Sequence, residues 1–238
     1  MKKTLLLLLM SPIFCLGQWN QIGNSINGQA AGDTCGWSTA ISADGTIVAM
    51  GSSGSSSIFP NAGQVRVFGF NNGNWSQIGA DINGESSGDQ TGQSVSLSDD
   101  GSVLAIGEPF NNDLGFTSGQ VRVFRNINNT WTQVGQDLYG ENSSAEGGKS
   151  VHLSADGSVV AFGIPNTTVN GVFFAGRVKV FENQNNNWVQ KGGDINGDGS
   201  IIKFGTSVSI SDDGNILAIG QTGNPGSQAQ TDIGRVKV

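Results

Sequence analysis

The stretch GQSVSLSDDGSVLAIGEPFNNDLGFTSGQVRVF, residues 92–124, decides the fold of this 238-residue chain because it recurs four times. Its opening glycine, its turn glycine and the tryptophan that follows it each repeat at steps of 56, 56 and 57 residues. A fixed period of this size is typical of repeat architectures. The repeated positions are Gly36, Gly92, Gly148 and Gly205; Gly45, Gly101, Gly157 and Gly214; and Trp19, Trp75, Trp131 and Trp188.

Each unit contains four predicted strands, which in the second unit are residues 94–98, 103–107, 120–124 and 131–138. Asp100-Gly101 between the first two is a strong hairpin signal, because such turns need residues that tolerate positive φ. One small antiparallel sheet cannot bury both of its faces, and sheets of this size stack radially. We therefore predict an all-β fold, a β-propeller of four-stranded antiparallel blades. A stacked β-solenoid is the alternative, although its coils are usually shorter.

The chain divides into a signal peptide, residues 1–17, and propeller repeats, residues 18–238. The segment directly after the signal peptide matches a fourth strand, and the chain ends in a third strand. That N-terminal segment could therefore complete the last blade and close a ring. However, Val238 stops one residue before a recurring phenylalanine. We expect about four blades here, truncated at the C-terminus and part of a larger, possibly seven-bladed, propeller. The units are residues 19–74, 75–130, 131–187 and 188–238.

The N-terminus predicts export to the cell surface or medium. Lys2 and Lys3 precede an apolar run that is too short to span a membrane, and cleavage is expected after Gly17. The mature chain keeps ten basic and 19 acidic residues, which argues against a nucleic-acid partner and an anionic membrane surface. We expect no membrane insertion after signal removal. Cys35 is then the only cysteine, so no intramolecular disulfide is expected.

The spacing also indicates where recognition occurs. Only the segment between the second and third strands varies in length from unit to unit, and variable loops on a rigid scaffold are common recognition elements. In an up-and-down sheet these loops share one face with the connections between blades. The Asp-Gly turns lie on the opposite face. We therefore expect any ligand on the face that carries the variable loops and the connections between blades.

These motifs resemble the FG-GAP repeats of integrin α-chains and bacterial surface proteins. Phe204-Gly205 matches the Phe-Gly of the family, Gly107-Glu108-Pro109 and Gly163-Ile164-Pro165 match its G-x-P, and the pattern G-x-V-x-V-F follows in the first three units. The resemblance implies a propeller with an adhesive role. Calcium-binding members carry a long acidic loop where this chain has only short turns such as Asp99-Asp100-Gly101, so the calcium site of the family is not carried over.

One stretch has the first half of a calcium loop, with Asp194, Asn196 and Asp198 as candidate ligands. The later acidic ligand is missing, because Ile202 and Gly205 stand at the ninth and twelfth positions. We favour a repeated strand end and polar turn, with no metal and no other cofactor.

Other polar side chains fit structural roles. His152 is the only histidine, which argues against a zinc site and leaves it facing the channel or a neighbouring blade. The basic side chains at one repeated position are expected to cover apolar surface and pair with acids, and the tryptophans to pack between blades. The acids before each first strand are interpreted as solvated loop charges. The basic set is Arg66, Arg122, Lys179 and Lys237, and the acids are Asp33, Glu85, Asp89, Glu141 and Glu146.

No acid was identified that breaks the repeat as a catalytic group would. We therefore predict a non-enzymatic binding or adhesion module for a protein or glycan ligand. The alternatives are a polysaccharide-active hydrolase or lyase on the same scaffold, and a structural repeat segment of a larger adhesin.

Overall fold

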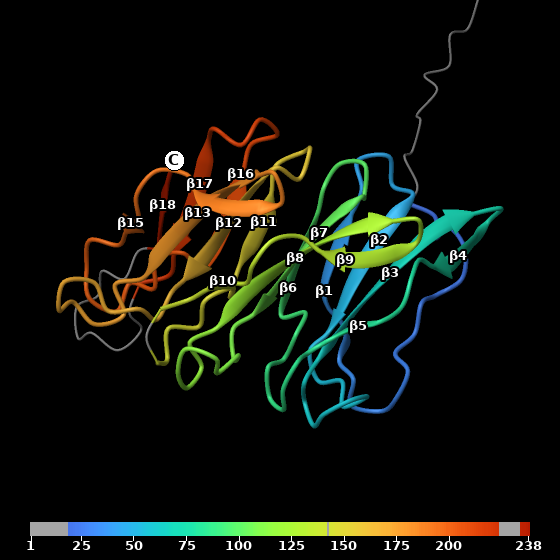
Figure 1. Cartoon of the computed structure of the whole chain (residues 1–238), viewed down its shortest axis with the longest axis horizontal. Coiled ribbons are helices and arrows are strands. Elements are labelled where there is room, and N and C mark those ends of the chain that lie inside the picture. Colours follow the sequence, from blue (N-terminus) through green and yellow to red (C-terminus); the bar gives the residue numbers. More distant parts are fainter. Residues whose placement is uncertain (1–18, 142, 224–233) are drawn as a thin grey trace, which may run out of the picture.

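The computed structural model describes residues 19–141, 143–223 and 234–238, so the predicted signal peptide lies outside the described part. Every regular element in that part is a β-strand, and the strands form four antiparallel sheets in chain order (Figure 1). The first strands of neighbouring sheets contact one another, as in a propeller. The predicted β-propeller of antiparallel blades is confirmed. No helix in the described residues is long and apolar enough to cross a membrane.

The strands of the four blades have the following bounds. Blade one contains β1 (Cys35–Ile41), β2 (Ile47–Ser52), β3 (Gln64–Asn71), β4 (Asn74–Gln77) and β5 (Ile82–Asn83). Blade two contains β6 (Ser94–Leu97), β7 (Val103–Glu108), β8 (Gln120–Ile127), β9 (Thr130–Gln133) and β10 (Leu138–Tyr139). Blade three contains β11 (Val151–Leu153), β12 (Val159–Ile164), β13 (Arg177–Gln184), β14 (Asn187–Gln190) and β15 (Ile195–Asn196). Blade four contains β16 (Ser207–Ile210), β17 (Leu217–Gln221) and β18 (Arg235–Lys237).

The predicted fourth strand is broken in two in each of the first three blades. In blade two, β9 and β10 both pair with β8, and Gly135 lies between them with a positive φ of 72°. The carbonyl before it, on Val134, accepts the indole N–H of Trp188 from blade three. The W-x-Q-x-G pattern therefore makes a kink that receives the tryptophan of the next blade, and not a continuous strand.

The Asp-Gly hairpins all lie along one edge, the upper one in Figure 1. Only the glycine of each turn has positive φ, for example 67° at Gly214, and the preceding aspartate accepts hydrogen bonds within the turn. Asp213 accepts hydrogen bonds from Ser211 Oγ and Asn215 N–H, which lower the pKa of Asp213 to about 2. Asp44, Asp100 and Asp156 accept the equivalent bonds in the other blades.

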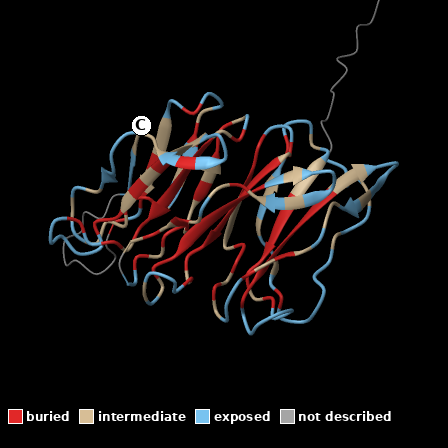
Figure 2. Cartoon of the chain, in the orientation of Figure 1, coloured by how far each residue is buried: buried red, intermediate tan, exposed pale blue. Residues whose placement is uncertain are grey.

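The blades are joined by close contact between glycines of neighbouring units. A Cβ on Gly107 would collide with the carbonyl oxygen of Gly148 in blade three, and Ser94 Oγ donates to that same oxygen at 2.8 Å. The same two contacts, a glycine packed against a carbonyl and a serine Oγ bonded to that carbonyl, join blades one and two and blades three and four. Apolar side chains of adjacent sheets fill the space between them, so the core consists of inter-blade layers (Figure 2).

The segment before blade one does not close a ring among the described residues. Residues 19–26 form no strand, and the indole N–H of Trp75 donates to Ile22 O, which places this segment beside blade one. Blade four, at the opposite end of the molecule in Figure 1, has three described strands. Cys35 is a free thiol in blade one.

Candidate functional site

The loop-rich face is the edge opposite the Asp-Gly turns, at the bottom of Figure 1. It carries the strand 2–3 loops, residues 53–63, 109–119 and 165–176, and the inter-blade loops, residues 27–34, 84–93, 140–150 without residue 142, and 197–206. The two kinds of loop are hydrogen-bonded to each other, so they share a face as predicted. The strand 2–3 loop of blade four, between β17 and β18, falls mostly outside the described residues.

Three backbone hydrogen bonds fix each described strand 2–3 loop to the inter-blade loop that follows its blade. In blade two, the N–H groups of residues 144, 146 and 147 donate to the carbonyls of residues 116, 117 and 118. The same three bonds occur at the equivalent residues of blades one and three. Backbone groups paired in this way hold the loop tips in defined positions.

The tips of these loops expose large apolar side chains in all three blades. The exposed fractions are 58% for Ile58, 55% for Leu114, 72% for Phe116 and 67% for Phe173. The Asp-Gly turns of the opposite face contain only serine, threonine, alanine, aspartate, asparagine and glycine, and exposed isoleucines flank two of them, Ile41 at 61% and Ile216 at 59%. Exposed apolar side chains that recur on one face often mark an interaction site.

Below the tips, acids of the inter-blade loops pair with basic side chains of the next blade. Glu85 lies 3.5 Å from Arg122, Glu141 pairs with Arg177 and lies 3.1 Å from Lys179, and Asp198 lies 3.0 Å from Lys237. The side chains of Arg66 and Arg122 also lie over the rings of Phe68 and Phe124. The predicted role of the basic set, pairing with acids and covering apolar surface, is confirmed for the pairs named here.

Glu108 at the end of β7 is a buried acid that the sequence analysis missed. Its carboxylate pairs with Arg122 and accepts hydrogen bonds from Gln120 at 2.6 Å and Thr91 at 3.0 Å. Complete burial raises the pKa of Glu108, while Arg122 and the hydrogen bonds act in the opposite direction. The repeat itself contained a signal for Glu108. It is the only acid at its repeated position, where the other units have Ser52, Ile164 and Gln221. Both carboxylate oxygens are engaged, and Arg122 also donates to the Asn83 carbonyl of blade one, so the network links blades one and two.

The interpretation of the loop acids as solvated charges was wrong for Asp33 and Asp89. Both are buried, and each carboxylate accepts two backbone N–H groups at the start of its inter-blade loop. Burial raises the pKa of Asp89. Glu85 and Glu141 lie in the ion pairs described above, and Glu146 pairs with Lys149 at 3.5 Å.

The three candidate calcium ligands face cationic side chains. Asp194 lies 2.9 Å from Arg177, and Asn196 Oδ1 accepts a hydrogen bond from the same guanidinium. Asp198 pairs with Lys237 of β18. Within the described residues, no cluster of three or more histidine, cysteine or acidic side chains is arranged to hold a metal ion.

His152 and the tryptophans connect blades. The Nδ1 atom of His152 accepts the Ile210 N–H of blade four at 3.2 Å, as Ser96 Oγ accepts the Leu153 N–H one blade earlier. Burial lowers the pKa of His152. The indoles of Trp131 and Trp188 donate to carbonyls of the preceding blade. The predicted inter-blade positions are therefore confirmed, while Trp19 is fully exposed.

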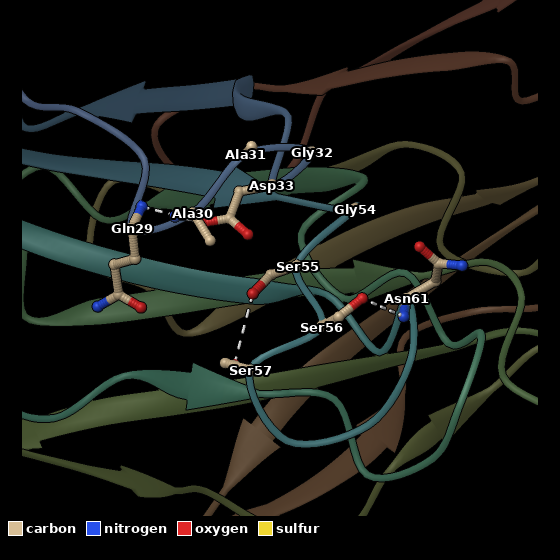
Figure 3. A pocket seen from close by; sticks show the side chains of 10 residues that line it. All are labelled: Gln29, Ala30, Ala31, Gly32, Asp33, Gly54, Ser55, Ser56, Ser57 and Asn61. Carbon is tan, nitrogen blue, oxygen red and sulfur yellow. Dashed lines mark hydrogen bonds between the residues drawn. The ribbon is translucent and has the colours of Figure 1, made fainter.

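The loop-rich face also has a pocket of about 390 Å³ in blade one. Its walls come from residues 29–33 of the inter-blade loop and from residues 54–57 and 61 of the strand 2–3 loop (Figure 3). Glycine, alanine and uncharged polar side chains make up the lining, with Asp33 as the only charged residue.

Comparisons with known proteins support the fold. No known family and no curated protein sequence matches the chain. Among solved structures, Sqt1 of Saccharomyces cerevisiae is similar with a TM-score of 0.52 and 14% identity, over 85% of this chain and 46% of that one. Hydrazine synthase of Kuenenia stuttgartiensis is similar with a TM-score of 0.50 and 13% identity, over 88% and 47%. The chain thus spans about half the length of these structures, and likeness at such identities shows the fold alone.

Proposed function

We propose that this protein is a secreted or cell-surface propeller, of the FG-GAP-like type, that binds a protein or a glycan through its loop-rich face. The observation that carries the proposal is the set of exposed apolar loop tips, residues 58–60, 114–116 and 172–174. Water disfavours such surface, so a recurrence in three successive blades indicates a partner that covers it.

The rigidity of the tips supports binding by a surface formed in advance. Each tip is tied to its neighbouring loop by three backbone hydrogen bonds. A surface that is ordered before binding loses less conformational entropy when the partner docks. Aromatic side chains at such positions contribute large contact area to both protein and sugar partners.

The charge of the protein narrows the partners further. The formal net charge of the chain is −7, and the cations Arg122, Arg177 and Lys179 on this face are paired with acids. An acidic surface repels nucleic acids, which bind through free cationic groups. The proposal therefore concerns protein or glycan partners.

The test replaces one ring in each blade, with Phe59→Ser, Phe116→Ser and Phe173→Ser combined. A matched control, Thr46→Asn, Ser102→Asn and Ser158→Asn, changes the opposite face to the residue found at Asn215. Wild type and both variants are applied to a printed glycan array and to an array of cell-surface proteins. We expect the loop variant to lose at least about tenfold in affinity. Equal binding by all three proteins would contradict the proposal, and turnover of a bound polysaccharide would favour the hydrolase or lyase alternative.

A further inference from the structure

The pocket of blade one lies where the repeat changes. Residues 54–57 read Gly-Ser-Ser-Ser, where blade two has Phe-Asn-Asn-Asp at residues 110–113. The side chains at these positions are thus smaller in blade one than in blade two, and in blade one all four residues line the pocket. The backbone is held in the same way in both blades, because Ser56 Oγ accepts the Asn61 N–H at 2.9 Å and Asn112 Oδ1 accepts the Thr117 N–H at 2.8 Å.

The lining has hydroxyl and amide groups and few charges. On one wall, Ser55 Oγ donates to Ser57 Oγ at 3.4 Å, and Ser57 Oγ also donates to Asn83 Oδ1 at 3.0 Å. Gln29 and Asp33 stand on the other wall (Figure 3). One carboxylate oxygen of Asp33 accepts the N–H groups of Gln29 and Ala30, so this acid is used by the loop backbone. The lining contains no lysine, arginine or histidine.

The loop tip of blade one follows directly on the pocket wall along the chain, and its own residues lie outside the lining. Residues 58–60 connect Ser57 to Asn61, which both line the pocket, and Ile58 and Phe59 of this tip are exposed. The site therefore combines a polar hollow with an adjacent apolar edge. Its volume is near the lower end of the range for small-molecule sites, about 300–1,000 Å³.

From these observations we propose that the pocket of blade one binds a single ring of a neutral saccharide. Sugar hydroxyls both donate and accept hydrogen bonds. The lining can answer them with the side-chain amide of Asn61, with the Gln29 amide beyond its bond to Asp81, and with the Ser56 hydroxyl beyond the N–H that it accepts. The C–H face of a sugar ring is apolar and suits an exposed phenylalanine. An anionic ligand would meet Asp33 without a compensating cation, and a metal ion would find one carboxylate where calcium requires six to eight oxygens.

This inference rests on the glycan alternative of the proposed function and is tested with simple probes. Methyl glycosides of glucose, galactose, mannose and N-acetylglucosamine, with glucuronic acid as the anionic comparator, are titrated into the full chain by ligand-observed NMR. We expect at least one neutral glycoside to bind at least about tenfold more tightly than glucuronic acid, because the uncompensated charge of Asp33 opposes the anion.

Ser56→Asn is the decisive variant. It copies Asn112 of blade two, so it keeps the bond that fixes the loop while it puts a larger side chain at a position that lines the pocket. We expect it to weaken glycoside binding at least tenfold. The matched control is Ser102→Asn on the opposite face, which copies Asn215 and leaves glycoside binding unchanged. Thermal unfolding of both variants checks that the fold is intact.

The outcomes separate this inference from the proposed function. Neutral glycosides that fail to bind, or that bind Ser56→Asn as well as wild type, would overturn the saccharide site. If array binding is then still lost in the loop-tip variant, the binding function stands without this pocket. If the loop-tip variant keeps all array binding, the binding function itself fails.

Discussion

Blades one and two have the same sheet and different loop ends. In both, the second strand pairs with its neighbours in the same register, with Ala49 opposite Val67 and Ala105 opposite Val123. At the end of that strand, blade one has Ser52 and an open pocket, while blade two has Glu108 in a sealed network. The comparison teaches that packing between blades constrains the sheet, whereas the loop end is free to hold either a structural network or a binding site.

The largest expected effect follows from breaking the sealed network of blade two. Glu108→Gln leaves Arg122 buried without its full counter-charge, and removing one partner of a buried ion pair typically costs about 3 kcal/mol or more. Ser52→Ala at the equivalent place in blade one should cost less than about 1 kcal/mol. Denaturant unfolding measures both, and similar costs would show that the two loop ends do not differ as described.

The shared scaffold is tested by a methyl group at the blade contacts. Gly51→Ala and Gly107→Ala each direct a Cβ at the carbonyl of Gly92 or Gly148, so we expect losses of about 1–3 kcal/mol in unfolding free energy. Gly193→Ala is the control, because a Cβ there meets nothing within 4 Å. The two blades should lose equal amounts. A loss in only one blade would mean that the inter-blade contacts are not equivalent.

Replacing each of the two buried aspartates compares the stability of the open loop of blade one with that of the sealed loop of blade two. Asp33→Ala and Asp89→Ala each remove the acceptor of two backbone N–H groups. We expect about 1 kcal/mol for Asp33, where the pocket lets water replace the carboxylate, and about 2 kcal/mol for Asp89, which is fully buried. Unfolding in urea provides the measurement. The reverse order would argue that the pocket of blade one is closed in solution.

How much could be predicted from the sequence depends on what each position repeats. The blades were predictable because glycines and small residues recur wherever neighbouring sheets meet, as at Gly107 and Ala105. The break in the fourth strand was not predictable. The glycine of W-x-Q-x-G is compatible with a strand, and only its contact with the tryptophan of the next blade explains the kink. The buried state of Asp89 was hidden for a similar reason. Its partners are backbone N–H groups, which have no signature in the sequence.

The candidate site was predictable only in outline. Loop-length variation predicted a ligand on the loop-rich face, which is the face that carries the pocket, but the pocket itself lies at residues 54–57, where a run of serines reads as an ordinary flexible loop. Glu108 was overlooked because one acid in an apolar strand has meaning only when the cation of the neighbouring strand is known. Such features arise from contacts between strands, so a single unit read by itself does not contain them.

The smallest expected effect concerns the inner strands, where blade three uses a titratable side chain for a bond that blade two makes with a hydroxyl. Burial lowers the pKa of His152 from 6.5, so below pH 6.5 the unfolded chain binds more protons than the folded one. Stability should therefore be complete above this pH and fall as the pH decreases. Because the ring is only half-buried, solvent screening limits the loss to about 0.5 kcal/mol. His152→Ser, which copies Ser96, should keep the bond and remove this difference between pH 7.5 and 5, as measured by urea unfolding. An unchanged pH profile in the variant would show that His152 is not the group that titrates.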